Sequence, residues 1–385
     1  MRIKLLILTI FTVQSYVFGQ PFLQTPIGGE QGKDWIVVNY VDWDTAGVKD
    51  HHCGTKAYDG HQGTDYVLKS FRQMDNGVDV LAAENGVVTY VQDGLFDRET
   101  EGIISKKLGN YVALRHDNKY YTYYAHLKKN SIPVKVGDTV KSGEVVGQVG
   151  SSGNSTDPHL HFEVWYDSAV LVDPYQGPCG NSTSLFTSPV PYDTGLYVWE
   201  SGIHRKNELN INELRERIVT EERPYQFKPS SDSVLNFWAH LSGVRKGKVV
   251  QTDWYAPDGQ LWFSFDVTLD QDYWYYYFWT FINHQNLAIG EWKVVLLYDG
   301  KQVVEEAFEV DDNVGLDQLH FSEPCASLAR DLVANKLNTL DLKRVEVFDV
   351  YGREVEPQHD LVPGIYIFQI AVHEGNVCRF KKWME

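Results

Sequence analysis

Positive charge and long apolar runs are both scarce in this chain. Its 385 residues include 35 lysines and arginines against 52 aspartates and glutamates, a formal net charge of −17. This acidity argues against nucleic acid and anionic membranes as partners, because both carry negative charge themselves. We interpret it as a contribution to solubility. Beyond residue 19 no apolar stretch is long enough to span a bilayer, so the sequence predicts a protein that is not membrane-spanning.

Apolar residues at helical spacing are also infrequent, whereas aromatic residues are abundant. Aromatic side chains make up 14% of the chain, with 23 tyrosines and 11 tryptophans, and short valine-rich runs alternate with Gly, Asn and Asp turns. Aromatic and β-branched residues favour strands. A length of 385 residues allows two or three domains. We therefore expect a mainly β protein of several domains.

The first 19 residues have the pattern of a secretory signal peptide. Arg2 and Lys4 form a short basic start, residues 5–11 are apolar, and Gly19 is a small residue suited to cleavage. A membrane anchor is the alternative, but the apolar run is too short for it. No cysteine follows the run, which argues against a lipoprotein. We expect the mature chain to be secreted or to lie at the cell surface.

Cysteines are few and even in number: Cys53, Cys179, Cys325 and Cys378. In an oxidising compartment an even count suggests disulfides. Of the three possible connectivities, pairing within domains (Cys53 with Cys179, Cys325 with Cys378) is the economical one. The alternative is that Cys53 offers a thiolate to a metal.

Two histidines in one strand-like run are the first candidate site residues. Residues 157–164 read Asp-Pro-His-Leu-His-Phe-Glu-Val, with His159 and His161 two positions apart. Residues i and i+2 of a strand point to the same face, so both imidazoles project together while Leu160 and Phe162 point into a core. Two such imidazoles suit a metal ligand beside a proton-transferring partner. The alternative is a pair of polar residues on a solvated face.

Three further candidates lie upstream of this pair. His61 and Asp65 form a His-x-x-x-Asp spacing, and His126 follows Tyr-Tyr-Ala. Catalytic zinc takes about three protein ligands and keeps one position open. His61, Asp65 and one histidine of the pair would supply such a set, and His126 and the remaining histidine could then handle protons.

In this order, these segments resemble the lysostaphin/LytM-type zinc metallopeptidases, which cut peptide bonds in bacterial cell walls. The resemblance covers about residues 50–175 and includes further family-like segments. Those segments are Val80-Leu-Ala-Ala-Glu-Asn-Gly-Val-Val, Gly109-Asn-Tyr-Val, Tyr124-Ala-His-Leu, Val136-Gly-Asp, Gly147-Gln-Val-Gly and Ser152-Gly-Asn-Ser. The resemblance implies a lysostaphin-like (duplicated hybrid motif) β-sheet peptidase domain.

The same resemblance implies roles for five residues. His61, Asp65 and His161 would bind one Zn²⁺, which lowers the pKa of a bound water to about 7. His126 and His159 match the family's two histidines that do not bind the metal and would act in proton transfer or oxyanion stabilisation. The sequence does not say which of the two is the base. Of the other nine histidines, only His52 is considered as an accessory.

The remaining chain divides into further segments. We expect the peptidase domain over residues 20–179, a connector over 180–230 with a short helix at 207–222, and an immunoglobulin-like β-sandwich over 231–312. Residues 94–108 are expected to form an inserted surface loop. The seven consecutive aromatics at 273–279 either stack on sugars or peptide, or pack within the sandwich.

Residues 325–385 form a separate small β domain in this interpretation. They resemble the C-terminal sorting domain of type IX secretion cargo, with Val345-Glu-Val-Phe-Asp-Val-Tyr-Gly, Gly364-Ile-Tyr and a basic last strand. The family's Pro-Asn-Pro opening is missing, and Glu323-Pro-Cys stands there. The alternative is an ordinary β module. As a sorting domain, it would make the secretion machinery a partner.

Three functions follow from these observations. The first is an exported zinc endopeptidase that cleaves peptidoglycan cross-links. The second is a secreted peptidase for Gly-rich proteins, which would share the same site. The third is a non-catalytic LytM-type regulator of cell-wall amidases, which we place last because such regulators lack metal ligands and this chain has all five positions filled.

Overall fold

The computed structural model describes residues 21–98, 107–205, 214, 225–227, 234–283 and 287–311, together with four strands near the C-terminus. The predicted signal peptide, Cys325, most of the predicted 207–222 helix and part of the 94–108 loop lie outside these residues. The chain is mainly β, as predicted. It divides into two compact units, one of residues 1–225 with 229–310 and one of residues 226–228 with 311–385.

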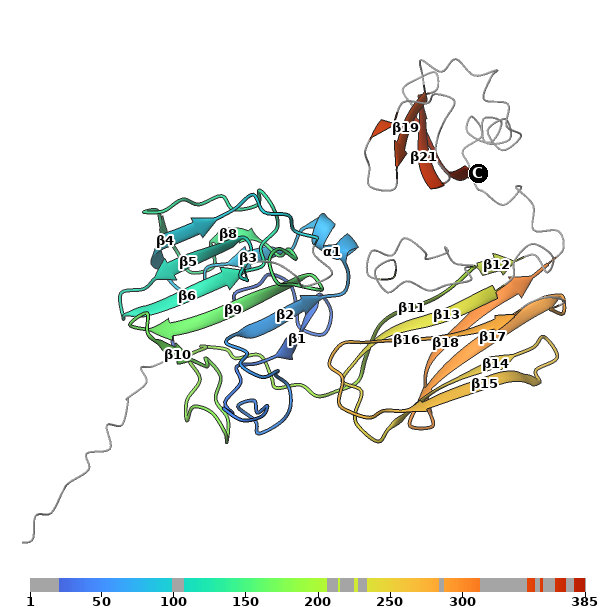
Figure 1. The fold of residues 1–385 in the computed structure, drawn as a ribbon, viewed down its shortest axis with the longest axis horizontal. Helices are drawn as coiled ribbons and strands as arrows, with labels where there is room; N and C mark the ends of the chain where they lie inside the picture. The colour runs from blue at the N-terminus through green and yellow to red at the C-terminus, as the bar shows by residue number, and fades with distance from the viewer. Residues whose placement is uncertain are drawn as a thin grey trace, which may run out of the picture. The chain divides into compact units, whose positions relative to one another are not determined.

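The first unit contains an antiparallel eight-stranded sheet. Seven strands follow the order β1-β2-β9-β6-β5-β4-β7, and the eighth, β10, pairs with the C-terminal end of β9. In Figure 1 the long green strand β9 lies between β2 and β6. A two-stranded sheet, β3 with β8, and the short helix α1 accompany it. The bounds are β1 (Trp35–Asn39), β2 (Thr64–Leu68), α1 (Phe71–Asn76), β3 (Asp79–Leu81), β4 (Gly86–Gln92), β5 (Tyr111–Arg115), β6 (Tyr120–Ala125), β7 (Thr139–Val140), β8 (Val145–Gln148), β9 (His159–Tyr166) and β10 (Val170–Val172).

The two-residue alternation along β9 decides which side chains enter the core. Leu160, Phe162 and Val164 are fully buried, and the Phe162 ring packs 5.3 Å from that of Tyr124 on β6. His159, His161 and Glu163 alternate with them and therefore point to the opposite face. The predicted H-x-H strand is thus observed, with its histidines on one face of a sheet whose other face is a packed apolar core.

A disulfide joins Cys53 to Cys179, one of the two pairings expected from the sequence. It connects the segment that precedes His61 to the segment that follows β10. Because both sulfur atoms are bonded to each other, the alternative in which Cys53 offers a thiolate to a metal is wrong. The other expected pairing, Cys325 with Cys378, lies outside the described residues.

Residues 197–310 contain the strands of two further sheets. One has three strands in the order β11-β13-β16, and the other has five in the order β12-β18-β17-β14-β15. Their bounds are β11 (Tyr197–Arg205), β12 (Tyr225–Phe227), β13 (Val234–Ser242), β14 (Val249–Tyr255), β15 (Leu261–Thr268), β16 (Tyr276–Asn283), β17 (Gly290–Tyr298) and β18 (Lys301–Val310).

Strands β11 and β12 lie in the stretch that was expected to be a connector. β11 pairs antiparallel with β13 over its whole length, with a bulge between Val198 and Glu200. Its apolar alternation is interrupted at Gly202, where a Cβ atom would meet the indole nitrogen of Trp238 at 3.0 Å. The Trp238 side chain of the partner strand and the Tyr225 hydroxyl occupy the space beside Gly202.

The two sheets pack through buried aromatic and threonine side chains. Trp254 Nε1 of β14 donates to Thr280 Oγ1 of β16 at 3.1 Å, which links the sheets through their interior. Within the predicted 273–279 aromatic run, Phe278 is buried whereas Trp279 is 45% exposed. The run therefore contributes to the interior and to the surface. The immunoglobulin-like assignment of these sheets stays a prediction.

The second unit contains a four-stranded antiparallel sheet in the order β20-β19-β21-β22. Its strands are β19 (Val345–Asp349), β20 (Glu354–Val355), β21 (Gly364–Ala371) and β22 (Val377–Met384). β19, β21 and β22 lie in the three tail segments that carry the resemblance to a sorting domain. Among the described residues of both units, no helix is both long and apolar enough to cross a membrane.

Candidate metal centre and neighbouring histidines

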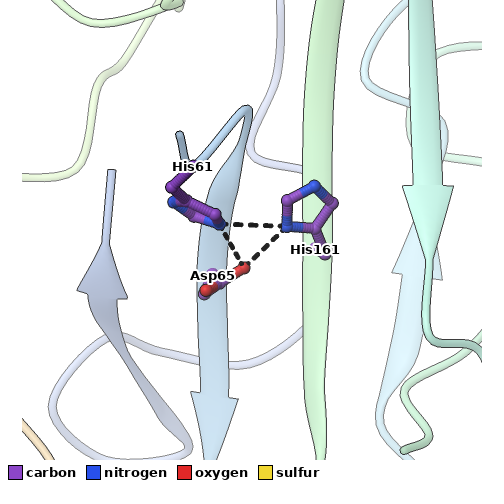
Figure 2. Close-up of side chains that lie close together, drawn as sticks. All are labelled: His61, Asp65 and His161. Atoms are coloured by element: carbon purple, nitrogen blue, oxygen red, sulfur yellow. Dashed lines mark hydrogen bonds and ion pairs between the residues drawn. The ribbon is translucent and has the colours of Figure 1, made fainter. Parts of the chain in front are cut away.

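His61, Asp65 and His161 direct three ligand atoms to one point (Figure 2). His161 Nδ1 lies 2.8 Å from Asp65 Oδ1, and His61 Nε2 lies 3.2 Å from each of these two atoms. All three residues are buried. Two imidazole nitrogens and one carboxylate oxygen form the donor set that zinc accepts in open, catalytic sites. Among the described residues, these three form the one group of metal-ligating side chains (of the types His, Cys, Asp and Glu) that lie close enough together to share an ion.

Strand pairing brings the three residues together from distant parts of the sequence. Asp65 of β2 lies directly opposite His161 of β9 in the antiparallel register, and His61 precedes β2 by a tight turn. Gly63 lies in that turn, and a Cβ atom there would meet His161 Cε1 at 2.7 Å. Only a residue without a side chain allows the His161 ring to approach the turn so closely.

Two of the three candidate ligands are oriented by hydrogen bonds to the atoms that do not face the shared ligand point. The backbone carbonyl of Tyr40 accepts a hydrogen bond of 2.7 Å from His61 Nδ1, so the lone pair of His61 is on Nε2. Asn39 Nδ2 of β1 donates to Asp65 Oδ2 at 2.8 Å, which leaves Oδ1 to face the histidines.

Glu163 holds the third candidate ligand. Its Oε1 accepts a hydrogen bond of 3.0 Å from His161 Nε2, and its Oε2 accepts one of 2.6 Å from Trp165 Nε1. Sequence reasoning assigned no role to Glu163 or Asn39. Glu163 could have been found, because it stands two residues after His161 and shares its strand face. Nothing in the sequence points to Asn39, whose partner is 26 residues away.

His126 and His159 lie against the triad. Their rings are 4.5 Å apart between centroids, His126 is 5.6 Å from the ring of His161, and His159 Nε2 is 3.8 Å from Asp65 Oδ1. All five residues expected from the sequence are therefore in one cluster. In both of these histidines Nδ1 donates to a backbone carbonyl, of Ser152 and Asp157 respectively, at 2.7 Å. The Nε2 atoms are left to act as proton acceptors.

The loop between β8 and β9 positions His126 through a hydrogen bond to its imidazole ring. His126 follows the last residue of β6 and has a positive φ of 61°, which turns its side chain out of the strand direction. Ser152 accepts from His126 through its carbonyl, and its hydroxyl donates to the carbonyl of Leu127 at 2.8 Å. This loop contains the Ser152-Gly-Asn-Ser segment that contributes to the family resemblance.

Burial and neighbouring charges divide the cluster into two protonation states. Burial would raise the pKa of Asp65, but His61, His159 and His161 hold it well below its usual value. Burial would lower the pKa of His161, but hydrogen bonds to Asp65 and Glu163 raise it to about 10. The pKa of His126 is held well below 6.5 by burial and by the neighbouring His159 and His161. Burial also lowers the pKa of His159, against the opposing effect of Asp65. Both are thus neutral at neutral pH.

A row of tyrosines continues the same sheet face away from the triad. Tyr123 of β6 is opposite Glu163 of β9, and its ring stacks 6.4 Å from that of Tyr111, which stacks 4.7 Å from that of Tyr90. Tyr90 is 44% exposed. On the other side, the exposed Tyr58 ring lies 4.3 Å from that of His61. Aromatic side chains therefore flank the candidate site on both sides.

The accessory histidine considered from the sequence lies elsewhere. The ring of His52 stacks on Tyr192 at 4.1 Å and meets that of His51 at 4.8 Å. His51 in turn lies 3.7 Å from Asp173 in a buried cluster next to the disulfide. These contacts give His51 and His52 a packing role, and neither belongs to the group that could share an ion.

Comparison with known families now adds to this geometry. Residues 59–174 match the family model described as Peptidase family M23. The chain contains an M23-type peptidase domain. This M23-type domain includes all five clustered residues and ends close to Asp173. The match covers well under half of the chain, and the sheets after residue 197 lie outside it.

Two relatives with similar sequences each align with about 30% of this chain. An uncharacterized metalloprotease of Buchnera aphidicola is 37% identical over 117 residues, which cover 30% of this chain and 26% of that protein. The peptidoglycan DD-endopeptidase ShyC of Vibrio cholerae is 38% identical over 112 residues, 29% of this chain and 22% of that protein. The chain thus spans about a quarter of the length of these relatives.

Among solved structures, the catalytic domain of the prophage-encoded M23 protein EnpA from Enterococcus faecalis, crystallised as a point mutant, is 27% identical. That alignment covers 39% of this chain and 93% of the EnpA chain, with a TM-score of 0.28.

Proposed function

We propose that this chain is a secreted zinc metalloendopeptidase that hydrolyses peptide cross-links of bacterial peptidoglycan. The observation that carries the proposal is the convergence of His61, Asp65 and His161 beside two neutral histidines, all within the M23-type domain. ShyC of Vibrio cholerae, which is 38% identical over 112 residues, is named a peptidoglycan DD-endopeptidase.

The donor set fits zinc. His61 Nε2, His161 Nδ1 and Asp65 Oδ1 supply two nitrogens and one anionic oxygen, and the ligand atoms of the trio lie within 4.8 Å of one another. Three protein ligands are the number found in catalytic zinc sites, where a fourth position remains for water or substrate. When bound, the ion supplies Lewis acidity, which polarises a peptide carbonyl and lowers the pKa of water to about 7.

His126 and His159 carry the proton-transfer part of the mechanism. Because their Nδ1 atoms are bonded to backbone carbonyls, their Nε2 atoms can accept a proton from an attacking water. Burial keeps both imidazoles neutral before the reaction, which is the state a base requires. Once protonated, the same imidazole can donate to the leaving amine or stabilise the oxyanion.

The flanking tyrosines supply a surface for an extended substrate. Tyr123 and Tyr111 are half-buried and stacked, so their rings are held in place before substrate arrives. Their position on the same sheet face as His161 supports a part in substrate binding, since that face is the one from which a peptide would reach the triad.

Digestion of purified sacculi tests the function. Wild-type protein with zinc should release muropeptides that mass spectrometry assigns to cleaved cross-links, while the isosteric Asp65→Asn variant should release none. Parallel incubation with a Gly-rich protein distinguishes the second candidate, a secreted peptidase for such proteins. Absence of zinc from the purified wild-type protein would favour the non-catalytic regulator of amidases. Intact sacculi after incubation with the zinc-loaded protein would contradict the proposal.

We also propose that the chain is exported. The Cys53–Cys179 disulfide supports an oxidising compartment, where such bonds persist. The basic and apolar start of the chain supports a signal peptide. The β19–β22 sheet in the last residues is compatible with a type IX sorting domain that engages the secretion machinery.

A further inference from the structure

We propose that Glu163 is a positioning residue that holds the ring and the tautomer of His161 for metal binding. The proposal rests on the proposed function, since it concerns the same zinc site. Glu163 does not point to the ligand atoms of the triad; it acts on them through the far nitrogen of His161.

The two oxygens of Glu163 have one donor each. Trp165 Nε1 is a donor only, so its hydrogen bond of 2.6 Å makes Glu163 Oε2 an acceptor. Glu163 Oε1 lies 3.0 Å from His161 Nε2. A carboxylate in this position accepts, so the proton of a neutral His161 is on Nε2 and the lone pair is on Nδ1. Nδ1, which faces Asp65 Oδ1 on the metal side of the ring, is then the nitrogen that can bind a metal.

His161 differs from the other three histidines of the cluster in the kind of acceptor it has. His61, His126 and His159 each donate through Nδ1 to a backbone carbonyl. His161 instead turns Nδ1 toward Asp65, where it would hold the metal, and has the Glu163 carboxylate at Nε2. A carboxylate acceptor raises the basicity of a ligating imidazole more than a carbonyl does, because it carries a full negative charge.

Burial makes the hydrogen bond between Glu163 and His161 more important for the stability of the site. Glu163 is 6% exposed, and a buried carboxylate is costly unless it is hydrogen-bonded and paired with positive charge. The two N–H donors satisfy its oxygens, and a divalent cation one imidazole away would balance its charge. The backbone at Gly63 also lies against the His161 ring, where a Cβ atom would meet Cε1 at 2.7 Å and Nε2 at 2.8 Å, so the ring has little room to move.

Glu163→Gln tests the proposal because it keeps the volume and removes one acceptor. A glutamine has one acceptor oxygen for two donors, so either His161 or Trp165 loses its partner. We expect zinc affinity, measured by competition with a chromophoric chelator, to fall about 10–100-fold. The visible spectrum of the Co²⁺-substituted protein should change too, and kcat should fall more than KM rises.

Trp165→Phe is the matched control. It removes the second donor and leaves the carboxylate free to serve His161, so zinc affinity should stay within about threefold of wild type. The double variant E163Q/W165F should recover part of the lost affinity, because the amide oxygen then has His161 as its one donor. Such recovery would not follow from a purely structural role, and thermal unfolding of the zinc-free variants measures that role separately.

Zinc affinity and a cobalt spectrum equal to wild type in E163Q would overturn the proposal while leaving the metal site intact. If E163Q does not fold, Glu163→Asp takes its place. The shorter carboxylate cannot reach both donors, and unchanged zinc affinity in that variant would overturn the proposal equally. A wild-type protein that takes up no zinc would overturn both this proposal and the proposed function.

Discussion

Asn39 and Asp65 are joined by a hydrogen bond of 2.8 Å between the amide of the first and Oδ2 of the second. Asn39 ends β1, and its backbone is opposite that of Asp65 in the β1–β2 pairing, after a bulge. The bond occupies one carboxylate oxygen and leaves Oδ1 for the ligand point shared with His61 and His161. A residue outside the candidate triad therefore leaves Asp65 Oδ1 as the oxygen that faces the ligand point.

Substitution of Asn39 by alanine should weaken metal binding without removing it. The Asp65 carboxylate would be free to rotate, and loss of such an outer contact costs about 10–100-fold in affinity. Competition with a chelator measures this effect, and thermal unfolding of the zinc-free variant controls for a change in the fold. An N39A protein with wild-type zinc affinity would show that Asp65 is oriented by other groups.

Loss of a metal ligand should be more severe. His61→Ala and Asp65→Ala should each leave the purified protein without its one zinc, because two remaining ligands do not make a stable catalytic zinc site. Zinc content by elemental analysis, with the wild-type protein prepared in parallel, gives the answer. Near-stoichiometric zinc in both variants would contradict the assigned ligand set.

His126→Ala and His159→Ala should separate metal binding from catalysis. Neither residue is assigned as a ligand, so zinc content should stay at one per chain. Turnover should fall about 10²–10⁴-fold, the usual contribution of a positioned proton-transfer group. The initial rate of muropeptide release from sacculi measures it. A variant that digests sacculi at the wild-type rate would have lost no catalytic group.

Zinc binding should depend on pH in a defined direction. Hydrogen bonds to Asp65 and Glu163 raise the pKa of His161 to about 10 in the metal-free protein, so the imidazole holds an extra proton at pH 7 to 9. Zinc needs the lone pair on Nδ1 and must displace that proton. Affinity should therefore rise with pH up to about 10, and binding should release a proton.

Calorimetry in buffers with different ionisation enthalpies counts the protons that zinc binding releases. Water on the zinc can also lose a proton, and a His126 or His159 variant is used to measure that contribution first. Zinc affinity that does not change between pH 7 and pH 9 would contradict a protonated His161 in the metal-free state.

Removal of residues 325–385 should affect export and not catalysis. Asp65, His126 and His161 lie in the other compact unit, and a unit with its own core can usually be removed without unfolding the rest. In the native host the truncated chain should accumulate in the periplasm, as fractionation and immunoblotting would show. The recombinant truncation should still digest sacculi. Normal export of the truncated chain would make the tail an ordinary β module.

Local patterns predicted the parts of this protein that depend on local geometry. The two-residue period of a strand places His159 and His161 on one face and Leu160 and Phe162 in the core, and the structure has this arrangement. The pairing of Cys53 with Cys179 followed from an even cysteine count and domain-wise economy. All five residues of the expected site also meet in one cluster.

Long-range pairing decided the rest. Asp65 and His161 meet because β2 and β9 are in one particular register, and a shift of one residue would turn either side chain to the other face. The contact from Asn39 depends on a third strand and a bulge. The approach of Trp238 of β13 to Gly202 of β11 likewise depends on the pairing of two strands that are distant in the sequence. The residue types of the site could be predicted from the sequence. The orientation of each ligand could not, because it depends on contacts with strands that are distant in the sequence and meet only in the assembled sheet.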